Sequence, residues 1–171
     1  MKTYQILSVP FLFVMIGCQQ RPMGGSRERT DEVAGLMAAE RAASALSGRE
    51  GFVRSMMSCL DDSGVLLRAH MMPAKGNAAR ITLQSRPDTG YTIVWEPLDG
   101  YVSESGELGY TYGTYTLTVK ASGKQEQGTY ATIWRKDKDD RWRMMLDVGN
   151  PGLKPEVPDT TAKDKQASVK Q

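Results

Sequence analysis

Three stretches decide the fold of this chain: GELGYTYGTYTLTVK at residues 106–120, GTYATIWRKD at 128–137 and RWRMMLDVG at 141–149. β-Branched and aromatic residues dominate them, and turn-forming residues fill the gaps at 121–124 and 136–140. This arrangement is typical of neighbouring strands joined by short turns. Glycines inside the first stretch indicate a bulge or a bend, which curls a long antiparallel sheet. The sequence therefore predicts a curved sheet.

Alternation along the first stretch places large side chains on both faces of that sheet. Tyr110 and Tyr112 share one face, whereas Thr111, Tyr115 and Leu117 share the other. A strand with bulk on both sides is covered on both sides. We expect helices on one face and a cavity or a partner on the other.

Length and charge limit the alternatives. A chain of 171 residues that is 40% hydrophobic can bury one ordinary core, so we expect one domain, spanning residues 30–152. The net charge of +2 is the difference between 22 basic and 20 acidic side chains scattered along the chain. Such a balance argues against nucleic acid as a principal partner.

Residues 1–18 have the pattern of an export signal. Lys2 is followed by an apolar run from Ile6 to Ile16, well short of the ~20 residues that a membrane-spanning helix needs. Met15 to Cys18 resembles the lipobox of bacterial lipoproteins, with methionine where leucine is usual. We expect cleavage before Cys18 and its lipidation; ordinary cleavage nearby or an uncleaved anchor are the alternatives. The residue after Cys18 is Gln19 rather than aspartate, which by resemblance to other lipoproteins suggests an outer-membrane anchor with the domain facing the periplasm.

The flanks of the domain differ from it in composition. Residues 19–29 contain one proline and two glycines among polar residues, as a flexible tether does. Residues 153–171 are almost free of apolar side chains, and we expect a disordered tail because burial cannot offset the entropy cost of ordering them.

The N-terminal half of the domain predicts helices that pack on the sheet. From Thr30 or Asp31, apolar residues recur at three and four spacing, and Glu40 falls on the same stripe. A carboxylate facing a core must be paired, protonated or lining a wet cavity. The remaining predicted elements are a helix at 49–59, a turn at 61–64, a strand at 65–69, a loop at 70–77, a short helix at 78–84 and strands at 91–95 and 100–105.

The order of these elements resembles that of the nuclear transport factor 2-like superfamily, which includes steroid isomerases and SnoaL-like polyketide cyclases. Several stretches are similar to an uncharacterised bacterial branch of that superfamily, although Glu107 stands where the branch usually has aspartate and Arg141 where it usually has glycine. These stretches are residues 51–52, 61–66, 95–97, 102–113, 134–136, 142–143 and 147–150. The resemblance implies an α+β fold in which a curved antiparallel sheet wraps around N-terminal helices, the cystatin-like cone barrel. It also implies a small, partly apolar ligand in the mouth of the cone, but no particular activity.

Two carboxylates and five aromatic residues are the candidate site. Glu40 and Asp147 are the candidate acid and base, because a carboxyl in an apolar site keeps its proton while a second one stays ionised. The structural alternatives are a bond from Glu40 to a tyrosine or a tryptophan N–H of the sheet, and one from Asp147 to a turn, Arg135 or Arg143. Aromatic rings with one polar tip suit the wall of a pocket for an apolar ligand, although plain sheet packing explains many such rings. The candidates are Trp95, Tyr110, Tyr112, Tyr130 and Trp134.

Three functions follow as alternatives. The first is a lipoprotein that binds a small, largely apolar molecule without chemistry. The second is a lyase, isomerase or hydrolase that uses Glu40 and Asp147. The third is a homodimeric interaction module that pairs through its open sheet face. One histidine and no spaced acid cluster give little support to a metal site, and no cofactor is expected. Once Cys18 is lipidated, only Cys59 remains, and its apolar surroundings indicate a small buried hydrophobe.

Overall fold

The computed structural model describes residues 26–86 and 88–153. The predicted signal peptide, Cys18 and most of the predicted tether and tail therefore lie outside the described residues. Within them, no helix has the length and apolar character needed to cross a membrane. The elements are α1 (Ser26–Glu50), α2 (Phe52–Cys59), β1 (Leu60–Leu67), β2 (Ala74–Lys75), α3 (Asn77–Gln84), β3 (Tyr91–Val102), β4 (Leu108–Val119), β5 (Gln125–Lys136) and β6 (Trp142–Pro151).

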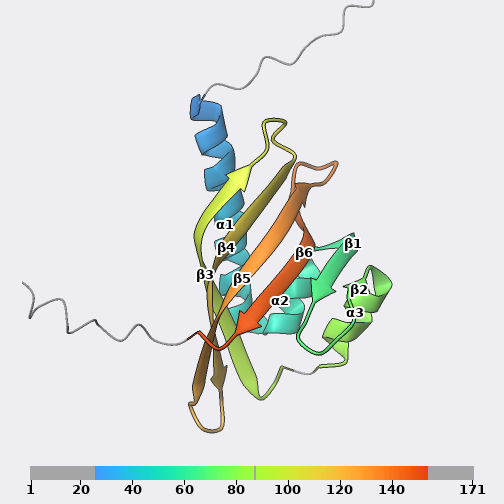
Figure 1. Ribbon diagram of the computed structural model, residues 1–171, viewed down its shortest axis with the longest axis vertical. Helices are drawn as coiled ribbons and strands as arrows, with labels where there is room; N and C mark the ends of the chain where they lie inside the picture. The colour runs from blue at the N-terminus through green and yellow to red at the C-terminus, as the bar shows by residue number, and fades with distance from the viewer. Residues whose placement is uncertain (1–25, 87, 154–171) are drawn as a thin grey trace, which may run out of the picture.

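The strands form one curved sheet in the order β2-β1-β6-β5-β4-β3. The predicted α+β class is confirmed. α1 runs along one face of the sheet, and β1, β2 and α3 lie together at the edge opposite to β3 (Figure 1). Strands β3 to β6 are antiparallel neighbours as predicted. However, β1 pairs with β6 in parallel, so the sheet is mixed rather than wholly antiparallel. It is also open, because β2 and β3 lie at its two ends.

A single bent strand replaces the two strands predicted at 91–95 and 100–105. β3 runs through Pro97, opposite Gly113 of β4, and the register shifts between Pro97 and Asp99. This bulge absorbs the proline, which has no N–H to give to a ladder. A side chain at Gly113 would come within 2.0 Å of the carbonyl oxygen of Glu96. The glycine is therefore required for the close approach of the two strands.

Two other boundaries also differ from the prediction. Residues 61–64, predicted as a turn, lie inside β1, where Asp61 Oδ1 accepts a hydrogen bond from the backbone N–H of Ser63 at 2.8 Å. This local turn interrupts the regular pairing of β1 with β6 between Leu60 and Val65. The predicted loop at 70–77 contains the short strand β2.

Serines of α1 attach the helix to β3, the edge strand of the sheet. The Ser44 hydroxyl oxygen accepts a hydrogen bond from the backbone N–H of Trp95 at 2.8 Å, and the Ser47 hydroxyl donates one to the carbonyl oxygen of Ile93 at 2.5 Å. An edge strand carries unpaired backbone groups that need partners when they are covered. The buried serines supply those partners and fix the position of α1 on the sheet.

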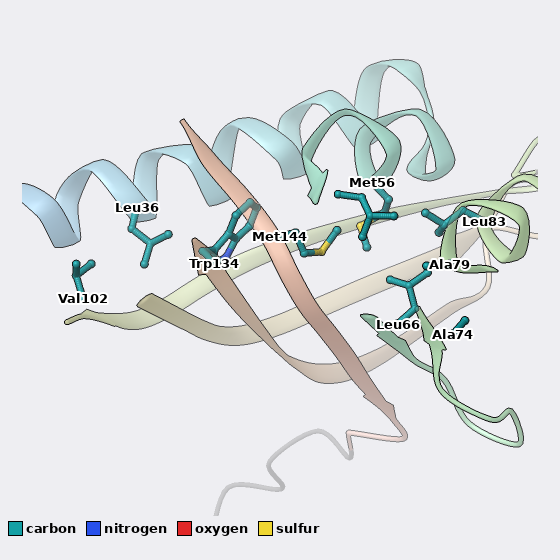
Figure 2. Close-up of a cluster of buried hydrophobic side chains, with 10 residues drawn as sticks. Leu36, Met56, Leu66, Ala74, Ala79, Leu83, Val102, Trp134 and Met144 are labelled. Atoms are coloured by element: carbon teal, nitrogen blue, oxygen red, sulfur yellow. The ribbon is translucent and has the colours of Figure 1, made fainter. Parts of the chain in front are cut away.

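The hydrophobic core lies between α1 and the inner face of the sheet and continues under α2 and α3. Figure 2 shows Leu36 and Val102 at one end of the cluster, Leu66 and Leu83 toward the other, and Trp134 near its middle. These five side chains are at most 5% exposed. Packing is complete at the Leu36 end, and the opposite end encloses a cavity.

Candidate functional site

A cavity of about 540 Å³ lies between the three described helices and the inner face of the sheet. This volume is within the roughly 300–1,000 Å³ range of small-molecule sites. Most of its wall is apolar, with Phe52, Leu83, Ile93, Tyr115 and Leu117 among the lining residues. The polar lining side chains include Thr82 and Arg86 at the α3 end and a group formed by Glu40, Tyr130, Thr132 and Asp147, which is the candidate for chemistry.

The strand register explains why the cavity begins where it does. On the inner face of the sheet, side chains of neighbouring strands lie next to one another in rows that cross the strands. Successive rows are two residues apart along each strand. The first row to consider lies under Leu36 of α1 and is apolar. α1 lies so close to this row that a side chain at Gly109 would come within 2.7 Å of Leu36. Its members are Val102, Gly109, Trp134, Met144 and Leu60.

The next two rows form the polar part of the cavity wall. One contains Thr111, Thr132 and Asp147 as successive neighbours on β4, β5 and β6. The following row places Tyr130 between Gly113 and Gly149. β3 approaches Gly113 closely, whereas Gly149, Tyr115 and Tyr130 all line the cavity.

Glu40 of α1 is 1% exposed and connects the helix to three strands. Its Oε1 accepts a hydrogen bond from Trp95 Nε1 at 2.5 Å. Its Oε2 accepts bonds from Thr111 Oγ1 at 2.5 Å and from Trp134 Nε1 at 2.8 Å. The structural alternative for Glu40, a bond to a tryptophan N–H of the sheet, is therefore confirmed, and Glu40 also lines the cavity.

The pKa of Glu40 lies above its usual value. Burial is the largest cause, the hydrogen bonds from Thr111, Trp95 and Trp134 oppose it, and the charge of Asp147 raises the pKa further. All of these donors are neutral, so none of them cancels the negative charge of the ionised form. The Thr111 hydroxyl can donate to the carboxylate or accept from the protonated acid. The site can thus hold either protonation state.

Asp147 on β6 has a cationic partner instead. Its Oδ1 lies 2.5 Å from Arg68 Nη2, and its Oδ2 accepts a hydrogen bond from Thr132 Oγ1 at 3.2 Å. Arg68 Nη1 also donates to the carbonyl oxygen of Asp147 at 3.2 Å. The predicted alternative partners, Arg135 and Arg143, are wrong: Arg135 pairs with Asp61, and Arg143 donates to backbone carbonyls.

The hydroxyl of Tyr130 is buried and has no hydrogen-bond partner among the described residues. The residue is 8% exposed and lines the cavity. Burial raises the pKa of this hydroxyl, and the nearby charges of Glu40, Glu96 and Asp147 raise it further. Its closeness to the Glu40 carboxyl also raises the pKa, although the two groups are not in full hydrogen-bond geometry. Tyr130 is therefore a neutral phenol that can donate one proton to an acceptor.

Three of the five predicted aromatic residues line the cavity: Trp95, Tyr130 and Trp134. Tyr110 and Tyr112 do not. They are 47% and 44% exposed and lie on the outer face of β4, opposite to the face that α1 covers. The alternation was predicted correctly, but the choice of the inner face was wrong for these two tyrosines.

Sequence reasoning missed several residues of the site. Arg68 follows β1 directly, and Tyr115 shares the inner face of β4 with Thr111. A signal for that face was present, since Gly109 and Gly113 have the same parity as Thr111. Small residues mark the side on which another element packs closely.

Cys59 lines the cavity but is not a reactive thiol. Burial, followed by the charges of Asp147 and Glu40, raises its pKa from 9.0 to about 12. A thiol in that state is almost wholly protonated near neutral pH and is a poor nucleophile. Among the residues that the structure describes, no group of three or more His, Cys, Asp or Glu side chains is placed to hold a metal ion.

Solved structures similar to this one have the same cone architecture. A ketosteroid isomerase-like protein from Erwinia carotovora atroseptica SCRI1043 matches with a TM-score of 0.58 and 17% identity, over 72% of this chain and 98% of that one. A nuclear transport factor 2-like (NTF2-like) protein of unknown function from Pseudomonas putida KT2440 matches with a TM-score of 0.56 and 14% identity, over 74% and 91%. An epoxide hydrolase of the LEH-like type from M. tuberculosis matches with a TM-score of 0.51 and 16% identity, over 71% and 88%.

No protein-family model and no curated protein sequence matches the chain. At these identities the structural likeness concerns the fold. The chain has the fold of the nuclear transport factor 2-like superfamily, as the sequence predicted.

Proposed function

We propose that this chain, which has the nuclear transport factor 2-like fold, binds a small and largely apolar molecule in the cavity between α1 and the sheet. The observation that carries the proposal is the cavity itself, about 540 Å³ in volume and lined mainly by apolar side chains. The buried polar groups at Glu40, Tyr130 and Asp147 suit recognition of one polar end of such a molecule. Similar folds in an isomerase-like protein and an epoxide hydrolase support a small-molecule site.

A cavity-filling variant tests this function. Gly149 lines the cavity, and a Cβ at this position would meet only Tyr115, at an ordinary contact distance of 3.6 Å. Gly149→Leu therefore places a bulky side chain in the ligand space. Gly35→Leu is the matched control, because Gly35 lies on the exposed side of α1 with no atom within 4 Å of its would-be Cβ.

The measurement is native mass spectrometry of the exported chain carrying Cys18→Ser, purified without detergent from the cells that make it. We expect a bound small molecule on the parent protein and on Gly35→Leu, and its loss on Gly149→Leu with the fold intact by circular dichroism. A parent protein that carries no small molecule, and whose melting temperature no apolar compound raises, would contradict the function.

We infer a cell-envelope location from the sequence alone. Cys18 at the end of the signal pattern would anchor the chain by lipid to the outer membrane, with the domain in the periplasm. Labelling cells with a radioactive fatty acid tests the anchor. The label should appear on the parent protein and on Cys59→Ser, and it should disappear from Cys18→Ser.

An enzymatic function is the second candidate, favoured by one observation: Glu40 and Asp147 line the same cavity. With its raised pKa, Glu40 would be the acid, and Asp147, the partner of Arg68, would be the base. Each is already engaged, Glu40 by three donors and Asp147 by Arg68 and Thr132. Conversion of the co-purified molecule should then fail in both Glu40→Gln and Asp147→Asn while its binding persists.

Self-association is the third candidate, favoured by the outer face of the sheet. The rings of Tyr101 and Tyr110 stack there at 5.8 Å, and Tyr110 pairs across the strands with Ile133. Exposed apolar patches of this kind often mark interfaces. Analytical ultracentrifugation should show a dimer that Tyr110→Glu disrupts and that the control Ile81→Glu, on α3, leaves intact. The large hydrophobic residues exposed on this face are Tyr101, Leu108, Tyr110, Tyr112 and Ile133.

A further inference from the structure

The Tyr130 hydroxyl is a buried donor without an acceptor in hydrogen-bond geometry among the described residues, whereas the donors next to it are directed to Glu40. The N–H groups of Trp95 and Trp134 and the hydroxyl of Thr111 are directed to Glu40. Buried polar groups in folded proteins almost always have a hydrogen-bond partner, so an unpaired one needs an explanation. A ligand oxygen that completes the bond is such an explanation.

The carboxylates near Tyr130 already have their own donors. Arg68 and Thr132 occupy Asp147, as the three donors occupy Glu40. The charges of both carboxylates act on the Tyr130 hydroxyl and favour its protonated state. They would also repel a negative group placed beside it. Beside Tyr130, an anionic ligand oxygen would meet the charge of Glu40 whenever that group is ionised, whereas an uncharged acceptor would not.

We propose that the Tyr130 hydroxyl donates a hydrogen bond to an uncharged acceptor oxygen at the buried end of the ligand, such as that of a ketone, an ester or an ether. This inference rests on the proposed binding of an apolar molecule and names its polar feature. Gly149, the neighbour of Tyr130 on β6, lines the cavity and carries no side chain into the place where that end would lie. The apolar body of the ligand then lies against Ile93 and Leu117, which also line the cavity.

Two probes of nearly equal size separate the hydrogen bond from apolar burial. 1-Tetralone carries one carbonyl oxygen, and tetralin is the same bicyclic skeleton without it. Their affinities for the exported chain with Cys18→Ser are measured by ligand-observed NMR titration. The same titrations are made with Tyr130→Phe, which removes the hydroxyl, and with Tyr112→Phe, which removes one from the outer face of the same sheet.

For Tyr130→Phe we expect the affinity for tetralone to fall about tenfold, as for a lost neutral hydrogen bond, while the affinity for tetralin is unchanged. The Tyr112→Phe variant should match the parent protein with both probes. The infrared carbonyl stretch of bound tetralone should lie at lower frequency in the parent protein than in Tyr130→Phe. The removal should cost little stability, because the hydroxyl has no acceptor in full hydrogen-bond geometry, and the melting temperature checks this.

The outcomes distinguish the two proposals. If Tyr130→Phe binds tetralone as tightly as the parent protein does, or weakens both probes equally, the hydrogen bond is refuted while apolar binding stands. If neither probe binds the parent protein, the apolar-ligand function fails, and the inference about Tyr130 fails with it.

Discussion

Glu40 and Asp147 are two carboxylates on one cavity wall, held by opposite means. Neutral donors from three strands surround Glu40, whereas a guanidinium neutralises Asp147. Glu40 is 1% exposed, and the side chain of Asp147 is 14% exposed. The two groups therefore differ in what their removal leaves behind: unpaired neutral donors in one case and an unpaired positive charge in the other.

This difference teaches what each carboxylate does for the fold. Glu40 ties the long helix to the sheet and closes the packed end of the cavity. Asp147 joins β6 to the end of β1, the one parallel pairing of the described sheet. A buried carboxyl surrounded by neutral donors keeps a protonation state that is sensitive to pH. The stability that an ion pair contributes is lost when either of its two side chains is removed. Four predictions follow from this contrast.

Glu40→Leu should cause the largest loss of stability. The change leaves the N–H of Trp95 without an acceptor and removes one hydrogen-bond partner each from Trp134 and Thr111. A buried group that is left unpaired costs about 1–3 kcal/mol. We expect the free energy of unfolding to fall by about 3 kcal/mol or more in total, as the sum of these costs. Glu40→Gln keeps one acceptor oxygen and should lose roughly 1–3 kcal/mol. Urea unfolding followed by tryptophan fluorescence measures both.

The matched control is Glu96→Gln on β3. Glu96 pairs with Arg41 on the surface, and its side chain is 64% exposed, so this change should cost less than ~1 kcal/mol. If Glu40→Gln and Glu96→Gln lowered the free energy of unfolding equally, the hydrogen bonds to Glu40 would not be a source of stability.

Asp147→Asn should have the second largest effect, about 2 kcal/mol, because it leaves the mostly buried Arg68 without a counter-charge. Arg68→Met alone should cost a similar amount, and the double variant should cost less than the sum of the two. The exposed pair of Arg80 with Asp62 is the control, since Asp62→Asn should change stability very little. Additive losses at 68 and 147 would show that the two side chains do not act as a pair.

Much of this contrast was visible in the sequence. Glu40 interrupts an apolar helical stripe, and a charge in such a place predicts buried partners. The curved sheet and its turns were predictable because the β-branched and aromatic stretches are long and clearly separated. The aromatic partners of Glu40 followed from chemistry, because tryptophan N–H groups are the donors that a β-rich core commonly holds.

The partner of Asp147 and the inner face of β4 were not predictable with the same reasoning. Arg68 meets Asp147 only because β1 inserts beside β6 in parallel, a pairing between segments about eighty residues apart. Tyr110 and Tyr115 are equally bulky, so alternation alone cannot tell which of them faces α1. The contact of α1 at Gly109 decides it, and such a contact is a property of the folded chain.

Stability should also depend on pH through Glu40. Because its pKa is raised in the folded protein, the folded state keeps a proton over a pH range in which the unfolded chain has lost it. The free energy of unfolding should therefore fall as the pH rises from the unfolded pKa through the folded one. Glu40→Gln cannot ionise and should lack this component. In Asp147→Asn the fall should be smaller and should end at lower pH, since the charge of Asp147 contributes to the raised pKa of Glu40 in the folded state. Parallel pH profiles for the parent protein and Glu40→Gln would contradict this assignment.

Cys59 offers the finest test, because both carboxylates influence its thiol. With a pKa of about 12 instead of 9.0, its thiolate fraction at a fixed pH is about a thousandfold lower than that of an ordinary cysteine. Asp147 contributes more to this shift than Glu40 does. In a Cys18→Ser background, labelling of Cys59 by Ellman's reagent should therefore accelerate more in Asp147→Asn than in Glu40→Gln. Labelling through global unfolding would instead follow the stabilities of the two variants and would make the rates rise with urea. A urea-independent rate that is greater in Asp147→Asn thus reports the local field of the two carboxylates.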